Sequence, residues 1–139
     1  MVTAIVLIRG RTGTKPDIVH TLGMLRLTRI NHCVIIRDPV KYKPMLQIVK
    51  DYTTWGEISK EFLHKMVEKR GRFPGNKKIP EDQVGAIVDA LEKGEKTEIK
   101  PVFRLHPARK GLKNKKATYP LGDLGYRGKT IEDLLRRMI

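Results

Sequence analysis

The chain has 139 residues, 40% of them hydrophobic, which is enough for one domain-sized core. Lysine and arginine number 29 against 15 acidic residues, so the net charge is +14 and the isoelectric point is near 10.1. A charge of this size repels itself unless a polyanion neutralises it, and we therefore expect a nucleic-acid partner. No apolar run approaches the roughly 18 residues that span a bilayer, and no signal-peptide pattern opens the chain, so we expect a cytoplasmic protein without a membrane partner.

The residue types that carry metal or redox chemistry are sparse. Cys33 is the only cysteine, so it can form neither an internal disulfide nor a multi-cysteine metal site. The four histidines show no ligand spacing, and no acidic cluster suggests the two-metal site of a nuclease. We expect no metal and no cofactor, and the fold must depend on packing.

The first 58 residues have the pattern of alternating strands and helices. Residues 2–8 form a β-branched and aliphatic run typical of a strand buried on both faces. A helix is expected over residues 16–27, because Thr14 and Asp17 have capping-box spacing and Pro16 suits a first turn. Residues 32–36 predict a second buried strand, closed by the proline at position 39.

A second helix and a third strand complete this unit. Residues 40–50 predict a helix with Met45, Leu46 and Val49 inward and Pro44 in its first turns, and residues 52–57 predict a strand. Right-handed crossovers would place both helices on one face of the sheet. We expect an α+β fold with a β-α-β-α-β core over residues 1–58.

The rest of the chain, residues 59–139, is expected to form a helical and basic-loop extension packed on this core. Apolar residues at helical spacing predict helices that include residues 58–66 and 84–91. Residues 69–78 are rich in charge, glycine and proline and predict an exposed loop. Thr130 and Asp133 have capping-box spacing before a final helix, with its apolar residues inward, namely Ile131, Leu134, Leu135 and Met138.

Basic residues gather in four regions that should be loops. The segment 104–127 is the most basic, with almost no acid, and we expect it to become ordered when it neutralises phosphates, since it cannot do so by burying apolar surface. The alternative is a solvated loop kept for solubility, but several basic runs together favour a broad binding surface. The predicted nucleic-acid contacts are Arg9, Arg11, Lys15, Arg26, Arg29, Arg70, Arg72, Lys77, Lys78, Arg104, His106, Arg109, Lys110, Lys113, Lys115, Lys116, Tyr119 and Arg127.

RNA is favoured over DNA, because the basic residues are spread over irregular loops and not along one helix that fits a groove. No RRM-type aromatic motif is present, and only 6% of residues are aromatic, which argues against recognition led by base stacking. Shape and phosphate contacts should dominate.

Three local patterns could indicate a catalytic or ligand site, and for each of them we favour a simpler role in packing or phosphate binding. Residues 10–15 lie between a strand and a helix, but their spacing is not that of a Walker A loop, so an RNA phosphate at the helix N-terminus is favoured over a nucleotide. Cys33 and His32 are neighbours on a strand and should point to opposite faces, so Cys33 is interpreted as a core residue. Trp55 is interpreted as a packing residue.

Several long strings resemble a known family. They include residues 8–10 with 15–18, 25–27 with 31–34, and 45–47 with 51–57; further matches lie at residues 103–107, at Arg109 and Gly111, and at 122–128 with 133–137. Over nearly the whole chain they are similar to the ribosomal protein L thirty family of the large subunit, in its long archaeal form.

This resemblance implies a ferredoxin-like core, with the residues after about Ile58 as the archaeal and eukaryotic-type extension. It also implies a single copy in the large subunit, contacts to its rRNA and to neighbouring ribosomal proteins, no homo-oligomer, no enzymatic activity and no cofactor. The chain begins almost on its first strand, so the long basic arm of eukaryotic relatives is expected to be absent. The rival hypotheses are an RNA-processing enzyme and a free nucleic-acid-binding regulator.

Overall fold

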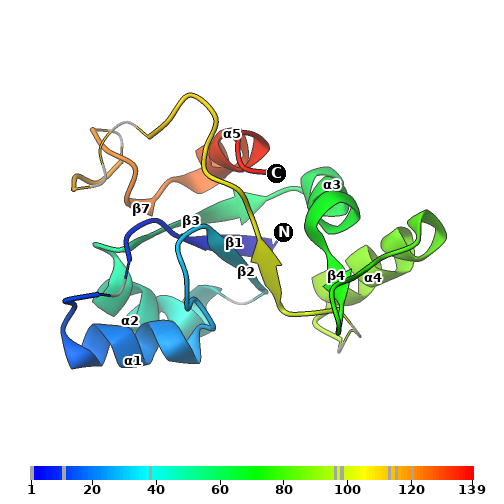
Figure 1. Cartoon of the computed structure of the whole chain (residues 1–139), viewed down its shortest axis with the longest axis horizontal. Coiled ribbons are helices and arrows are strands. Elements are labelled where there is room, and N and C mark those ends of the chain that lie inside the picture. The colour runs from blue at the N-terminus through cyan, green and yellow to red at the C-terminus, as the bar shows by residue number, and fades with distance from the viewer. Residues whose placement is uncertain are drawn as a thin grey trace.

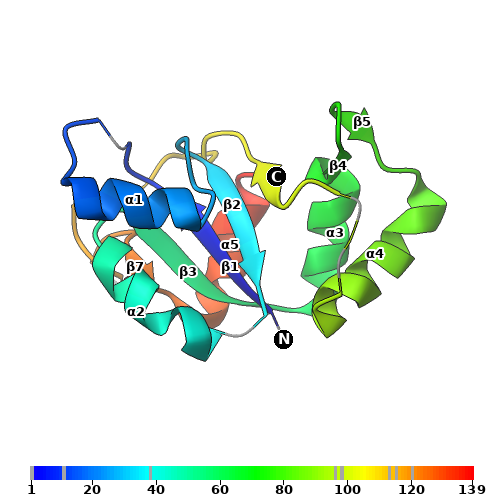
Figure 2. The same cartoon turned by 90° about the horizontal axis from the view of Figure 1, so that it is seen from below.

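In a computed structural model, residues 2–10, 12–37, 39–95, 97, 99–112, 114, 116–119 and 121–139 are described. A five-stranded sheet in the order β6-β2-β1-β3-β7 forms its centre (Figures 1 and 2). Its strands are β1 (Val2–Leu7), β2 (His32–Ile36), β3 (Thr53–Ile58), β6 (Val102–Arg104) and β7 (Gly125–Tyr126). The helices are α1 (Pro16–Met24), α2 (Pro39–Val49), α3 (Lys60–Arg70), α4 (Glu81–Lys93) and α5 (Ile131–Arg136).

The predicted β-α-β-α-β order is confirmed, but the reason given for its geometry was wrong. Strand β1 lies between β2 and β3 and is antiparallel to both, with Ala4 opposite Ile35 on one side and Gly56 on the other. The rule of right-handed crossovers applies only to connections between parallel strands. In this sheet it covers the connection from β2 through α2 to β3, which are parallel to each other on either side of β1, and it does not cover the connection from β1 through α1 to β2. All six residues of β1 are buried, as expected for a central strand.

Helices α1 and α2 lie together on one face of the sheet, as predicted (Figure 1). The alternation of side chains along a strand sends Ile5 and Leu7 to this face, where they pack with Leu22 of α1 and Leu46 and Val49 of α2. Trp55 belongs to the same cluster with 9% exposure, which confirms its role in packing.

The opposite face carries the larger core and is covered by α5 and α3, with α4 packed against α3 (Figure 1). Val2, Ala4, Val6 and Ile8 of the first strand and its exit point to this face. Cys33 is buried in the same cluster, and its burial raises the pKa of the thiol to about 12, so it is the small core residue that was predicted.

Residues after Ile58 complete both edges of the sheet. Strand β6 pairs antiparallel with β2, and β7 pairs parallel with β3. Phe103 of β6 is 1% exposed and joins the larger core. The proposed division at residue 58 stays a prediction, but the two parts share one sheet and one hydrophobic cluster.

One predicted helix end and two predicted side-chain caps were wrong. Helix α1 ends at Met24 and not at residue 27, because Arg26 takes a left-handed conformation with φ of 64°. Neither Thr14 nor Thr130 caps a helix with its side chain: Lys15 is the N-cap of α1, and the Thr130 hydroxyl donates to the Arg127 carbonyl in a short 3-10 helix, η1 (Gly128–Thr130). Ser59 does cap α3 with its side chain, which accepts from the Phe62 amide.

Residues 69–78, predicted to be an exposed loop, are more ordered than expected. Lys69 and Arg70 finish α3, and a hairpin of β4 (Arg72–Phe73) and β5 (Lys77–Lys78) follows (Figure 2). Asn76 closes its turn with φ of 62°, a conformation that asparagine tolerates better than most residues.

Candidate nucleic-acid interface

Four residues lie at one end of the sheet, and we call them the sheet-end cluster: Arg9, Arg29, His32 and Arg104. Strands β1 and β6 finish at this end and β2 starts there, so residues distant in sequence meet. The Asn31 amide donates to the Leu7 carbonyl, and the Leu105 amide donates to the Asn31 carbonyl. The cluster therefore joins three regions that were predicted separately.

Arg9 is fixed in this cluster by contacts within the protein. Its guanidinium carbon lies 4.9 Å from the centre of the Tyr52 ring, and Nη1 donates to the Asp51 carbonyl at 3.4 Å. A cation held over an aromatic ring keeps its charge and loses little further freedom on meeting a phosphate. The geometry of Arg9 thus suits a preorganised anion contact.

His32 lies directly opposite Arg104 across the strand pair, and its Nδ1 atom is buried without a hydrogen-bond partner among the described residues. Burial lowers the pKa of the imidazole, and the positive charges of Arg104 and Arg29 lower it further. His32 is neutral at neutral pH, and the sheet-end cluster takes its charge there from its three arginines.

The lowered pKa of His32 predicts a pH dependence of folding. The unfolded chain takes up a proton on His32 near pH 6.5, whereas the folded chain does so only at lower pH, so the free energy of unfolding falls as the pH drops from about 7.5 to 5. His32→Gln should flatten this fall, as urea denaturation at several pH values would show. The other three histidines serve as the control, since both proteins carry them, and equal slopes in the two proteins would contradict the prediction.

The segment between β6 and β7 lies beside this end of the sheet, on the side of α5 (Figure 1, yellow to orange). We had expected it to bury no apolar surface, and that was wrong. Leu105 and Leu124 are 8% and 1% exposed, and Ala108 and Leu112 pack against the core. Burial of these apolar side chains therefore orders part of the segment without RNA. That RNA orders the tip of the segment stays a prediction.

A buried ion pair organises the second half of this segment. Arg127 Nη1 lies 3.4 Å from Asp123 Oδ1, and the two side chains are 9% and 3% exposed. The other oxygen of Asp123 accepts the Asn114 amide at 2.9 Å, and the Arg127 guanidinium stacks 5.3 Å from the centre of the Tyr119 ring. Burial lowers the pKa of Arg127, and Asp123 offsets part of that shift. Arg127 and Tyr119 thus hold the loop together, and direct RNA contacts by them stay predictions.

The first half of the segment is tied to the end of the chain. His106 Nε2 lies 3.0 Å from the Ile139 backbone oxygen and Nδ1 lies 2.7 Å from the Pro107 carbonyl, and a ring nitrogen that carries a proton donates to the oxygen it faces. Arg137 Nη1 donates to the carbonyls of Arg109 and Gly111 at 3.3 Å and 2.8 Å. With their backbone held in this way, the side chains of Arg109 and Lys110 remain exposed.

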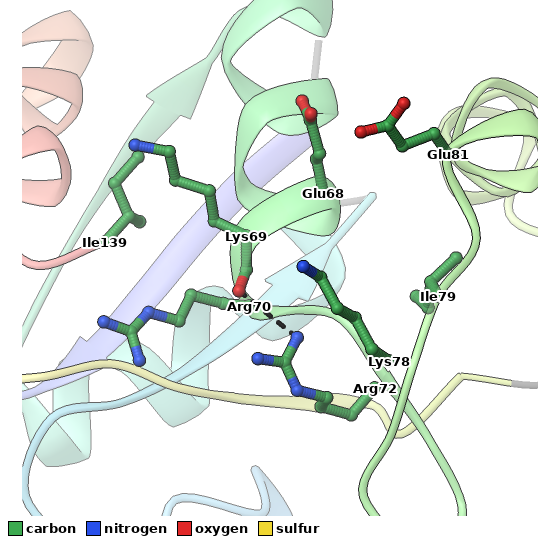
Figure 3. A pocket seen from close by; sticks show the side chains of 8 residues that line it. All are labelled: Glu68, Lys69, Arg70, Arg72, Lys78, Ile79, Glu81 and Ile139. Atoms are coloured by element: carbon green, nitrogen blue, oxygen red, sulfur yellow. Dashed lines mark hydrogen bonds between the residues drawn. The ribbon is translucent and has the colours of Figure 1, made fainter.

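A second concentration of charge lies where α3 meets the hairpin, around a hollow of about 400 Å³ (Figure 3). Lys69, Arg70, Arg72 and Lys78 line it together with two carboxylates, Glu68 and Glu81, and two isoleucines. The predicted contacts Arg70, Arg72 and Lys78 are therefore brought together, although acids share the hollow with them.

The remaining predicted contacts lie at other places on the surface. Lys15 is exposed at the start of α1, Arg26 is exposed beyond its end, and Lys77 and Lys116 are exposed in the hairpin and the basic loop. Arg11, Lys113 and Lys115 lie outside the described residues. Contacts between the predicted residues and RNA stay predictions.

Reasoning from sequence missed the residues that position the basic loop. Asp123, Asn114 and Arg137 hold its backbone, and Lys100 lines a basic groove beside β6. The signal for Asp123 was present, since it is a lone acid in the basic segment 104–127. No sequence pattern indicated Lys100, because only the fold brings it near other cations.

Two classes of feature are not found in the described part of the chain. No described helix is long and apolar enough to cross a membrane. Nor do three or more described histidine, cysteine or acidic side chains come together in a group that could hold a metal ion.

A mixed sheet with arginines at one end and a basic loop tied beside it presents a cationic surface of the kind that nucleic-acid-binding proteins carry. Residues 3–53 match the family model described as Ribosomal protein L30p/L7e. The large ribosomal subunit protein uL30 of Methanosphaera stadtmanae is 47% identical, with 98% of this chain and 99% of the relative covered. The proteins of the same name from Methanococcus maripaludis and Archaeoglobus fulgidus are 46% and 42% identical, over 100% and 97% of this chain and 100% and 98% of those relatives. The chain belongs to this ribosomal protein family, as the sequence motifs predicted.

Proposed function

We propose that the protein is a structural constituent of the large ribosomal subunit that binds and stabilises rRNA. The observation that carries this proposal is the full-length similarity to archaeal large-subunit proteins, and the sheet-end cluster supplies a matching surface. The protein acts in the cytoplasm as part of the ribosome and has no enzymatic activity, so the RNA-processing enzyme is set aside.

The partners that follow are large-subunit rRNA and neighbouring ribosomal proteins. We further propose a single copy in each subunit, no homo-oligomer and no membrane partner. The +14 charge supports this role, because it favours a monomer that is neutralised by RNA over self-association.

The proposed mechanism is neutralisation of closely spaced phosphates. RNA segments that would repel one another are held at fixed positions by arginines whose own freedom is already restricted, as for Arg9 on Tyr52. Each phosphate contact releases condensed counterions, so affinity must fall as salt rises. The proposed contacts are the eighteen residues predicted from the sequence, from Arg9 to Arg127.

The basic loop provides the test. Replacing Arg109, Lys110 and Lys116 with alanine should raise the Kd for large-subunit rRNA roughly 10- to 100-fold near physiological salt, since each lost phosphate contact removes its share of counterion release. All three side chains are exposed, so the melting temperature should stay nearly unchanged. Fluorescence anisotropy with labelled rRNA fragments and thermal unfolding measure the two quantities.

A matched control has the same loss of charge elsewhere. Lys43, Lys65 and Lys93 are exposed on α2, α3 and α4 and lie outside the proposed contacts. Their replacement by alanine should raise the Kd much less. Equal losses of affinity in both triple variants would show that total charge matters and not this loop, and a salt-independent Kd of the unaltered protein would contradict the proposed function itself.

A further inference from the structure

A basic groove lies between the β4–β5 hairpin and the edge strand β6. Its hollow measures about 220 Å³ and is lined by Arg70, Arg72, Asn76, Lys100, Val102 and Arg104. The lining comes from three places in the chain: the end of α3, the hairpin, and the segment that leads through β6. Strand β6 is the outermost strand of the sheet, so one of its backbone edges faces this side without a strand partner among the described residues.

Two cations of this groove, Lys100 and Arg72, are held in place by hydrogen bonds. The Lys100 amide donates to the Arg72 carbonyl at 2.8 Å, and Lys100 Nζ donates to Asn76 Oδ1 at 2.7 Å. Arg72 Nη1 donates to the carbonyls of Gly71 and Lys69, at 2.7 Å and 3.2 Å (Figure 3, dashed line for the latter). None of these partners neutralises a charge, because all of them are neutral oxygens.

The groove concentrates positive charge without compensation. Four of its six lining residues are cationic and none is acidic, and among the described residues none of the four forms an ion pair. The neighbouring hollow at the end of α3 differs in this respect, since Glu68 and Glu81 line it. Four cations around one small hollow repel one another, and an anion placed between them removes that cost.

The chemistry of the lining narrows the kind of anion. It offers guanidinium groups, one ammonium and one amide, which are donors that suit phosphate oxygens. No aromatic side chain lines the groove, so it has no platform for stacking a base. The lining therefore fits a nucleic-acid backbone and does not read sequence.

We propose that this groove seats a stretch of rRNA phosphodiester backbone that passes along β6, with Lys100 and Arg104 as phosphate ligands. The proposal rests on the proposed function and adds a particular site to it. Lys100 becomes a contact that no motif in the sequence indicated. Arg104 belongs to both the groove and the sheet-end cluster, so the bound backbone would continue from the hairpin to the end of the sheet.

The test compares the salt dependence of rRNA binding in two charge-matched double variants of the full chain. In the first variant, Lys100→Gln is combined with Arg104→Gln; in the second, Lys65→Gln is combined with Lys93→Gln on exposed faces of α3 and α4. The Kd for large-subunit rRNA fragments is measured from about 0.05 to 0.3 M salt. The slope of log K against log salt should shrink by roughly 0.7 for each lost phosphate contact in the groove variant and stay unchanged in the control. Equal melting temperatures of the variants would confirm that the fold is intact.

The outcomes separate the groove from the general function. If the unaltered protein binds rRNA with a steep salt slope and both variants keep that slope, the groove proposal is overturned and the proposed function stands. If the unaltered protein itself shows no salt dependence, the proposed function fails first. If the groove variant keeps its rRNA affinity but no longer enters large subunits, the groove receives an acidic protein segment instead, which also overturns the proposal.

Discussion

Alanine at Gly56 should lower the free energy of unfolding by about 3 kcal/mol, because a methyl group has no room there. Gly56 lies in the middle of β3, where η1 and α5 cross the sheet, and its added carbon would collide with the Gly128 carbonyl oxygen and approach Ile131 Cγ2 to 2.9 Å. The nearest obstacle is backbone, which cannot turn away as a flexible side chain would. Chemical denaturation of the variant measures the loss.

Gly85→Ala is the matched control for this substitution. Gly85 lies in α4, and an added carbon would meet no atom within 4 Å. Alanine is a better helix former than glycine, so this variant should gain about 0.5 to 1 kcal/mol. If Gly56→Ala were as stable as the unaltered protein, the close approach of η1 to β3 would be wrong, and with it the placement of the basic loop that leads into η1.

Removal of the Asp123 carboxylate is expected to have the other large effect. Asp123→Ala should destabilise the protein by about 3 to 5 kcal/mol, because it leaves the Arg127 guanidinium buried without its counter-ion. It also removes the acceptor of the Asn114 amide. Since this pair shapes the basic loop, the Kd for rRNA should rise together with the loss of stability.

Two comparisons isolate the cause. Asp133 is 77% exposed and lies 3.8 Å from Arg136 in a loose pair, so Asp133→Ala should change the free energy of unfolding by less than about 0.5 kcal/mol. Arg127→Met combined with Asp123→Ala should be less destabilised than Asp123→Ala alone, because the unpaired charge is gone. A double variant as unstable as the sum of its single variants would show that the two residues do not interact.

The central part of the fold could be predicted from the sequence because its signals are local. Residues 32–36 form an apolar, β-branched run, and β2 has the bounds that this run indicated. Strands β6 and β7 have three and two residues, too few for a periodic pattern, and they form only because the edges of the sheet accept them. The end of α1 was misplaced for a related reason: the left-handed conformation of Arg26 follows from tertiary packing and not from a glycine signal.

The candidate interface could likewise be predicted from the sequence only in part. Charge is visible in sequence, so the basic regions were found, but which cations converge is set by strand pairing. Arg104 acts on His32 only because β2 and β6 are antiparallel neighbours, whereas Arg29 lies three residues before His32 in the chain. The basic segment was read as wholly dependent on RNA for its order, because Asp123 and Leu124 could not be recognised as buried before the sheet was known.

Sedimentation of ribosomal subunits tests the central claim most directly. Subunits from native cells are separated on sucrose gradients after washes of increasing salt, and the protein is detected in each fraction. We predict that it stays with the large subunit through washes near physiological salt and leaves as the salt approaches about 1 M, where phosphate contacts are screened. Its presence in the small-subunit or soluble fractions at low salt would contradict the proposed role.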